Sequence, residues 1–262
     1  PQKQAPESKK GIKAAVFDID ETLFGMKEKR FIPSAIEGLK KLQEKGILVI
    51  LATGRPPQTA LSICEEGVCP DYIVCVNGHR ILDREGKVIA DHFFDPVLAD
   101  EIYEYCRKEN IGLLWKYEDG IYEYIHSHAS EKFYDKTKTS RKNLFFGLRD
   151  SALPGGPNGG CLACAKEALS AFNRHFEGRC RAVAIDGESS DLMLFGVNKA
   201  SGVEEVLCRL QISPKECIGF GDNLNDREIL SYAGIGVWVG NGSEELKKLA
   251  DYVTTNNWED GF

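Results

Sequence analysis

The sequence contains no apolar run long enough to cross a membrane and no apolar segment at its amino end. Spanning a bilayer takes roughly 20 apolar residues in succession, and no stretch of the 262 residues approaches that length. Residues 1–10 are polar and lack the apolar centre of a secretion signal, so we expect a disordered tail there and no export. A membrane is therefore not an expected partner.

An excess of positive charge is also missing. The chain has 33 Lys and Arg against 40 Asp and Glu, which gives a formal net charge of -7. Nucleic-acid binding relies on clustered Lys and Arg that release counterions from the phosphate backbone. We therefore do not expect a nucleic acid as the main partner, and an anionic substrate would need local cations or a metal ion.

The nine cysteines lack the pattern of a disulfide framework. Their number is odd and their spacing is irregular, which indicates free thiols in a reducing cytoplasm. Cys161-x-x-Cys164 has the spacing of a metal or redox pair, but no second Cys pair and no well-spaced His accompanies it. We interpret these two residues as core or helix-face cysteines.

The glycine-rich segments lack the residues of a nucleotide-binding loop. No strand leads into residues 154–160 and no Lys-Ser/Thr follows them, so we expect a flexible loop rather than a phosphate cradle. Residues 234–236 lack the third glycine of a dinucleotide-binding fingerprint, and we interpret them as strand packing. No internal repeat is present.

What the sequence does contain is a pair of aspartates directly after an apolar run. Residues 12–17 predict a short buried strand, so Asp18 and Asp20 fall at its carboxyl end, where open α/β sheets bind ligands. Side chains two residues apart on a strand point the same way, and the two carboxylates can therefore converge on one reacting centre. Taken alone, such a short motif is more often a solvated acidic turn.

Strands and helices alternate on both sides of a long insert. Ser34 is expected to cap a helix that ends at residue 46, and buried strands are predicted at 47–51 and 72–76 with a helix at 58–66 between them. The alternation resumes after residue 196, with a helix capped by Ser243 near the end. This pattern predicts a Rossmann-like, doubly wound parallel sheet of the α/β class.

The insert mixes short strands with helices, which are predicted at 98–110 and 163–175. We therefore interpret it as an inserted α+β cap domain. The expected organisation is a tail at 1–10, a discontinuous core domain at 11–81 and 197–262, and a cap domain at 82–196.

Four strand ends or helix starts carry reactive groups, namely Asp18 with Asp20, Thr53, Lys199, and Asp222 with Asp226. Each has a bland alternative: a strand-ending turn, a solvated helix start or an Asx-rich helix cap. Their joint order on an α/β pattern makes a chance match improbable and favours phosphoryl chemistry.

This order resembles the haloacid dehalogenase superfamily, whose motifs are Asp-x-Asp-x-Thr, a Ser/Thr strand end, a Lys at a helix start and Gly-Asp-x-x-x-Asp. Further segments resemble its Cof-type subfamily of sugar-phosphatase-like enzymes with a C2 (IIB) cap: 51–55, 76–78, 234–237 and 240–243. The resemblance covers residues 12–81 and 197–262, and it covers the insert only by position and length.

The resemblance implies that Asp18 is the nucleophile, which forms an aspartyl-phosphate, and that Asp20 protonates the leaving oxygen and later deprotonates water. It implies Mg²⁺, held by Asp18, the backbone carbonyl of Asp20 and Asp222, with Asp226 supporting the metal or the lysine. Thr53 and Lys199 would contact the phosphoryl group. The predicted substrate contacts are Thr53, Gly54, Arg55, Asn77, Lys199 and Asn225.

One residue departs from the pattern of the family. Glu21 stands where many relatives have Gly and adds a third acid near the site. It would either alter the loop geometry or repel a substrate carboxylate. In the insert, residues 115–117 and several aromatic strand residues are candidate substrate contacts, although aromatic strand residues belong more often to the core.

The expected function is Mg²⁺-dependent hydrolysis of a small soluble phosphomonoester, such as a sugar phosphate, in the cytoplasm. A phosphomutase or phosphotransferase of the same superfamily is the nearest alternative. A phospho-acceptor signalling module would carry its aspartate in mid-chain and would have no use for the insert. A catalytically silent binding module would have no need of both aspartates. The substrate and the oligomeric state stay open.

Overall fold

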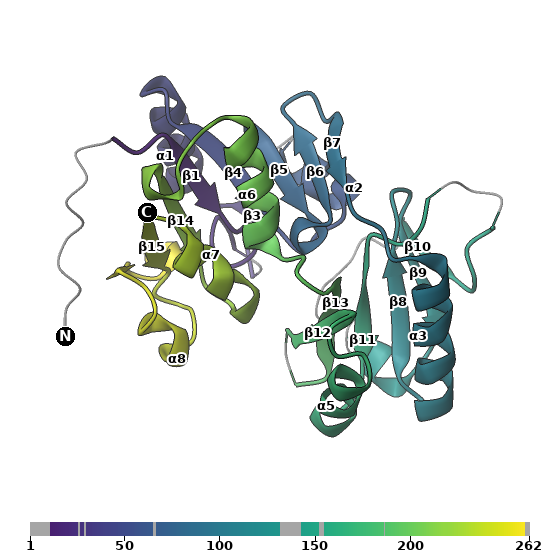
Figure 1. Cartoon of the computed structure of the whole chain (residues 1–262). Helices are drawn as coiled ribbons and strands as arrows, with labels where there is room; N and C mark the ends of the chain where they lie inside the picture. Colours follow the sequence, from purple (N-terminus) through teal and green to yellow (C-terminus); the bar gives the residue numbers. More distant parts are fainter. Residues whose placement is uncertain are drawn as a thin grey trace.

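Two β-sheets, one of eight strands and one of six, form the body of the computed structural model (Figure 1). The structure describes residues 11–25, 27–28, 30–64, 67–131, 143–151, 155–185 and 187–259, and the tail expected at residues 1–10 lies outside them. Within these ranges, no helix combines the length and the apolar character that crossing a membrane requires.

The larger sheet, here called the core sheet, is mainly parallel. Its strands are β1 (Ala14–Phe17), β4 (Leu48–Ala52), β5 (Tyr72–Cys75), β6 (Arg80–Asp83), β7 (Val88–Asp91), β14 (Cys217–Gly221), β15 (Ile235–Trp238) and β16 (Tyr252–Val253). They lie in the order β16-β15-β14-β1-β4-β5-β6-β7, and only β6 and β7 run antiparallel to their neighbours. The expected parallel α/β sheet is thereby confirmed.

Helices cover both faces of the core sheet because successive strand side chains point to opposite faces. On one face, Ala15 and Phe17 pack with α1 (Pro33–Glu44). On the other, Ala14 and Val16 pack with α6 (Lys199–Arg209) and α7 (Arg227–Tyr232). The remaining elements here are β2 (Phe24–Gly25), β3 (Arg30–Phe31), α2 (Pro57–Cys64), η1 (Val76–Gly78), η3 (Pro214–Glu216), η4 (Leu224–Asp226), α8 (Glu244–Lys247) and η5 (Asn257–Glu259).

The smaller sheet, here called the cap sheet, comes entirely from the insert. Its strands are β8 (Gly112–Lys116), β9 (Ile121–Ile125), β10 (Leu144–Phe146), β11 (Gly159–Ala163), β12 (Cys180–Ala184) and β13 (Ser189–Leu194), in the order β10-β9-β8-β11-β13-β12. Apart from the parallel pair of β9 and β10, neighbours are antiparallel. Two helices, α3 (Pro96–Glu109) and α5 (Lys166–His175), pack on one face of this sheet.

The chain passes from one sheet to the other later than the sequence suggests. The hairpin β6–β7 pairs with β5 and extends the core sheet, so the division expected at residue 82 falls inside a strand. The change of sheet occurs between Asp91 and Gly112. The return passes from β13 to α6, and Figure 1 shows these two segments joining the sheets.

Two local predictions are wrong. Residues 159–163 form β11, at the centre of the cap sheet, and not the end of a loop and the start of a helix. The glycines there serve close packing, because a Cβ on Gly159 would lie 2.6 Å from Cγ1 of Val76. Ser34 does not cap α1; the cap position is Ile32, with Pro33 opening the helix.

A glycine sets the approach of α6 to the core sheet. Gly78 has φ +101°, and a Cβ on it would lie 2.1 Å from the carbonyl oxygen of Asn198. Asn198 is the N-cap of α6, where its side chain accepts a hydrogen bond from the Ser201 amide at 2.9 Å. The first residue of that helix is Lys199. The position of Lys199 therefore depends on residue 78 being glycine, which has no side chain.

We predict that Gly78→Ala destabilises the fold by about 2–4 kcal/mol. Alanine is strained at the positive φ of residue 78, and its Cβ would clash with the backbone of Asn198. Gly38→Ala is the control, since Gly38 lies in α1 and a Cβ added there would meet nothing within 4 Å; it should be neutral or stabilising by up to about 1 kcal/mol. Urea unfolding measures both. Equal effects of the two substitutions would contradict the close approach of α6.

Candidate active site

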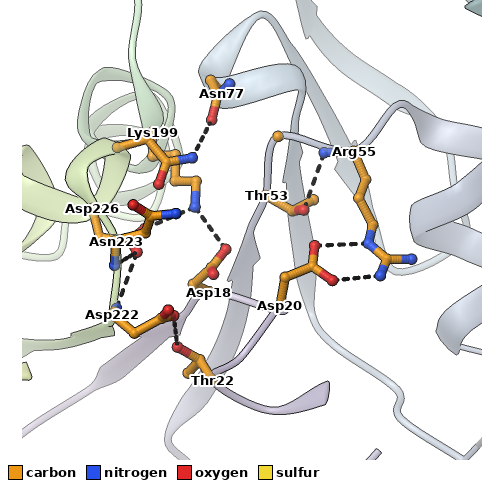
Figure 2. A network of polar contacts seen from close by, with 12 residues as sticks. Asp18, Asp20, Thr22, Thr53, Arg55, Asn77, Lys199, Asp222, Asn223 and Asp226 are labelled. Carbon is orange, nitrogen blue, oxygen red and sulfur yellow. Dashed lines mark hydrogen bonds and ion pairs between the residues drawn. The ribbon is translucent and has the colours of Figure 1, made fainter. Parts of the chain in front are cut away.

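Three neighbouring parallel strands deliver polar side chains to one edge of the core sheet. Phe17 pairs with Leu51 of β4 and with Phe220 of β14. Asp18, Thr53 and Asp222 follow these strands, and they therefore meet at the carboxyl edge of the sheet, as Figure 2 shows. The sequence-predicted residues at the strand ends are thus brought together.

Lys199 enters this group from the start of α6 and is 1% exposed. Its Nζ donates hydrogen bonds to Oδ1 of Asp18 at 2.6 Å and to Oδ1 of Asp226 at 2.7 Å. Burial alone would lower the pKa of this ammonium, but the two carboxylates raise it above its ordinary value. The lysine therefore stays charged and joins two otherwise separate segments.

Asp18, Asp222 and Asp226 form an acidic cluster, here called the acid triad. Each offers a carboxylate oxygen, and these oxygens all lie within 4.8 Å of one another. Burial raises the pKa of Asp18 to about 7, although Lys199 opposes the shift. Burial, followed by the charge of Asp18, also raises the pKa of Asp222. One ammonium cannot neutralise three carboxylates, and a set of hard oxygen donors with excess negative charge fits Mg²⁺.

Two members of the acid triad, Asp222 and Asp226, have further contacts that orient them. Thr22 donates from Oγ1 to Oδ1 of Asp222 at 2.7 Å. Oδ2 of Asp226 accepts hydrogen bonds from the backbone amides of Asp222 and Asn223 at 3.2 and 3.1 Å. Asp226 thus ties Lys199 to the loop that carries Asp222, and its direct binding to a metal stays a prediction.

Asp20 is turned away from the acid triad and toward Arg55 (Figure 2). Nε and Nη2 of Arg55 donate to the two carboxylate oxygens of Asp20 at 2.9 and 2.5 Å. The guanidinium also lies over the ring of Phe24, 5.2 Å from its centre. Sequence reasoning placed Arg55 on the substrate and missed this bidentate pair; the substrate contact stays a prediction.

The other predicted substrate contacts line one wall of the site. Thr53 and Asn77 are buried, and the Asn77 amide donates to the carbonyl of Thr53 at 2.9 Å. Asn77 has φ +52° and accepts a hydrogen bond on Oδ1 from Nδ2 of Asn225 at 3.2 Å. Oδ1 of Asn225 is buried and accepts no hydrogen bond among the residues that the structure describes. A buried acceptor without a partner is one to which a ligand could donate a hydrogen bond, and the substrate contact of Asn225 stays a prediction.

Glu21 contacts the C-terminal segment through its backbone and its side chain. Its backbone has φ +57°, a conformation that glycine adopts without strain. The carbonyl accepts a hydrogen bond from Asn241 at 2.9 Å, and the carboxylate faces Asn257 at 3.5 Å. These contacts and the left-handed backbone show that Glu21 shapes the loop after Asp20.

The insert contributes two side chains beside this wall. Nζ of Lys116 donates to the carbonyl oxygen of Gly54 at 2.9 Å and to Asp191 at 2.8 Å. The sequence marks Lys116 as a candidate contact, whereas no sequence pattern marks Asp191 as one. The aromatic neighbours Trp115 and Tyr117 pack in the apolar layer with α3 and α5, as core residues do.

Comparison with known proteins identifies the family. The sequence model of the haloacid dehalogenase-like hydrolases matches residues 15–262. This chain belongs to that family. The match runs through both sheets, so the resemblance inferred from the four motifs is confirmed, and the expectation of an enzyme of the hydrolase class is confirmed with it.

Individual relatives share about a quarter of the sequence. An HMP-PP phosphatase of Serratia proteamaculans is 27% identical over 90% of this chain and 86% of its own length. A Streptococcus pyogenes protein, whose name pairs a phosphatase with a peptidyl-prolyl cis-trans isomerase, is 28% identical over 97% of this chain. The chain spans 53% of that relative.

A solved structure with the same fold is that of a haloacid dehalogenase subclass IIB sugar phosphatase. It is 26% identical, with a TM-score of 0.84 over 95% of this chain and 96% of that one. The agreement includes the insert, because the alignment covers nearly the whole of both chains.

The raised pKa of Asp18 generates a prediction for the metal-free protein. An acid whose pKa rises on folding, here from 3.8 to about 7, holds its proton more tightly in the fold, so stability falls as the pH rises through this window. In EDTA, Asp18→Asn should therefore raise the melting temperature by on the order of 5 °C near pH 8 and by clearly less near pH 5, where only part of the loss has occurred.

Asp100→Asn, on the exposed surface of α3, is the matched control and should leave the melting temperature unchanged at both pH values. Scanning calorimetry at both pH values measures the difference. A gain for Asp18→Asn of the same size at both pH values would show that burial of an ionised carboxylate is not its cause.

Proposed function

We propose that this chain is a Mg²⁺-dependent phosphatase that hydrolyses a small soluble phosphomonoester through an aspartyl-phosphate on Asp18. The observation that supports this proposal most directly is the contact of Lys199 with Asp18. Nζ of Lys199 lies 2.6 Å from the carboxylate of Asp18, in a buried site with an excess of carboxylates. The activities named for the Serratia relative and for the sugar phosphatase support a small phosphorylated metabolite as the substrate.

The metal would be held by Asp18, Asp222 and the backbone carbonyl of Asp20, with Asp226 behind Lys199 as a supporting carboxylate. When bound, Mg²⁺ neutralises the charge of the phosphoryl group, which would otherwise repel a carboxylate nucleophile. Lys199 and Thr53 add a positive charge and a hydroxyl donor for the same oxygens. These groups are fixed by the fold before substrate arrives.

The reaction would then proceed in two steps. In the first, an oxygen of Asp18 forms a bond to phosphorus while the bond to the leaving oxygen breaks, and Asp20 donates its proton to that oxygen. In the second, Asp20 takes a proton from water, which attacks phosphorus and releases Asp18. The products are an alcohol and inorganic phosphate, and Arg55 holds Asp20 in position for both proton transfers.

The cysteines support a reducing compartment. The eight whose side chains the structure describes are free thiols, and five of them are buried. Cys161 lies inside β11 and burial raises its pKa to about 12, which disfavours a reactive thiolate at this position. We therefore infer a cytoplasmic location.

The function predicts hydrolysis of p-nitrophenyl phosphate and of a panel of phosphorylated metabolites in the presence of Mg²⁺. EDTA should abolish the activity, and Asp18→Asn should lower kcat/KM by about a thousandfold or more because the nucleophile is lost. Asp100→Asn is again the control. Activity that survives Asp18→Asn would sink the mechanism, and an isomerised sugar phosphate in place of inorganic phosphate would indicate a phosphomutase.

Arg55 gives a separate prediction, because its proposed action runs through Asp20. Arg55→Lys keeps the charge but loses the bidentate geometry. It should lower kcat/KM about 10- to 100-fold for an alkyl phosphate, whose leaving oxygen needs a proton, and much less for p-nitrophenyl phosphate. Asp20→Asn should show the same preference. Equal losses for the two substrates would show that Arg55 acts on the phosphoryl group instead.

A further inference from the structure

The cap sheet presents one face to the core, and that face carries a buried pair of opposite charges. Trp115 and Leu192 point to the opposite face, where they pack with α3 and α5. Because strand side chains alternate, their sequence neighbours Lys116 and Asp191 point toward the core. Each of these charged residues is only 5% exposed.

The pair reaches across the central strand β11 to the loop that follows β4. Lys116 lies opposite Gly159 and Asp191 lies opposite Cys161 in the strand register. Nζ of Lys116 contacts Oδ1 of Asp191 at 2.8 Å and the carbonyl of Gly54 at 2.9 Å. The cap is therefore fixed against the segment that carries Thr53 and Arg55.

One carboxylate oxygen of Asp191, Oδ2, has no hydrogen-bond donor among the described residues. Oδ2 of Asp191 lies 3.2 Å from the position that a Cβ on Gly54 would occupy, and Nδ2 of Asn77 lies 3.3 Å from the same point. Among the described residues, this oxygen accepts no hydrogen bond, since the contacts of Asp191 with Lys116 and Cys161 both use Oδ1. A carboxylate oxygen can accept two hydrogen bonds.

Stability alone does not account for such a pair. A buried ion pair is weak evidence for stability, because the cost of removing two charges from water offsets their attraction. The carboxylate lies beside Asn77 and Gly54, and Gly54 directly follows Thr53, the proposed contact of the phosphoryl group. A group attached to that phosphate would therefore be close to Asp191.

We propose that Asp191 is a specificity-determining residue whose free oxygen accepts a hydrogen bond from a hydroxyl or amino group of the leaving group. Lys116 is the positioning residue that holds the carboxylate in place. The inference rests on the proposed function, because it assigns the leaving-group side of the same site. It favours a polyol or amino-alcohol phosphate and disfavours a leaving group with a carboxylate at that place, which Asp191 would repel.

The test compares two substrates, glucitol 6-phosphate and p-nitrophenyl phosphate, which has no donor on its leaving group. The main variant is the double substitution Lys116→Met with Asp191→Leu, which removes both charges and leaves neither unpaired. It should lower the ratio of the two kcat/KM values about 10- to 100-fold, the worth of a hydrogen bond to a charged group. Asp191→Asn should change the ratio in the same direction but less.

Glu228→Gln is the matched control. It removes the negative charge from a different contact between cap and core, in which Nη2 of Arg181 donates to Glu228 at 2.7 Å, without touching the proposed acceptor. The ratio should not change in this variant. An unchanged ratio in the folded double variant would overturn the role of Asp191, because a purely structural pair would affect both substrates equally.

Calorimetric binding of glucitol 6-phosphate and phenyl phosphate separates this inference from the proposed function. If the parent protein hydrolyses neither probe, the function fails, but tighter binding of glucitol 6-phosphate that disappears in the double variant upholds the role of Asp191. If the parent hydrolyses both probes and the ratio of their kcat/KM values is the same in the double variant, the proposed function stands and the role of Asp191 fails. Equal binding of the two probes by an inactive parent overturns both.

Discussion

A single buried ammonium joins the separate parts of this site. Lys199 contacts Asp18 after β1 and Asp226 beyond β14, so the start of α6 is fixed to two parallel strand ends at once. Negative charge remains in excess at the site, because the acid triad carries more of it than one lysine offsets. A divalent cation fits such an arrangement, and under the proposed function the carboxylate of Asp18 would be both a ligand of that cation and the nucleophile.

The rest of the molecule serves this arrangement at two places where the backbone packs closely. Gly78 lets Asn198 approach, which sets the first turn of α6. Gly159 lets β11 pass beside Val76, which brings the cap sheet against the core. Beside that second contact Lys116 reaches Gly54, so residues of both sheets contribute to the wall proposed to hold the substrate. Under the proposed function, the core sheet would supply the reacting groups and the cap sheet would contact the leaving group.

Much of this could be predicted from the sequence, because strand ends in a parallel sheet are marked by local patterns. Asp18, Thr53 and Asp222 each follow an apolar run, and their meeting follows from the topology. The pairs of Arg55 with Asp20 and of Lys116 with Asp191 could not be predicted in this way, since they join residues far apart whose contact depends on side-chain directions. Composition also misled at Gly159, where glycine serves packing in a strand instead of loop flexibility.

Calorimetric titration of the parent protein with Mg²⁺ near pH 6, repeated in buffers of different ionisation enthalpy, tests the central claim most directly. The acid triad predicts saturable binding of one Mg²⁺ per chain with release of protons, because burial raises the pKa of Asp18 and of Asp222 and the metal needs their ionised forms. Asp222→Ala should abolish the binding. Binding without proton release, or binding that persists in Asp222→Ala, would contradict the account.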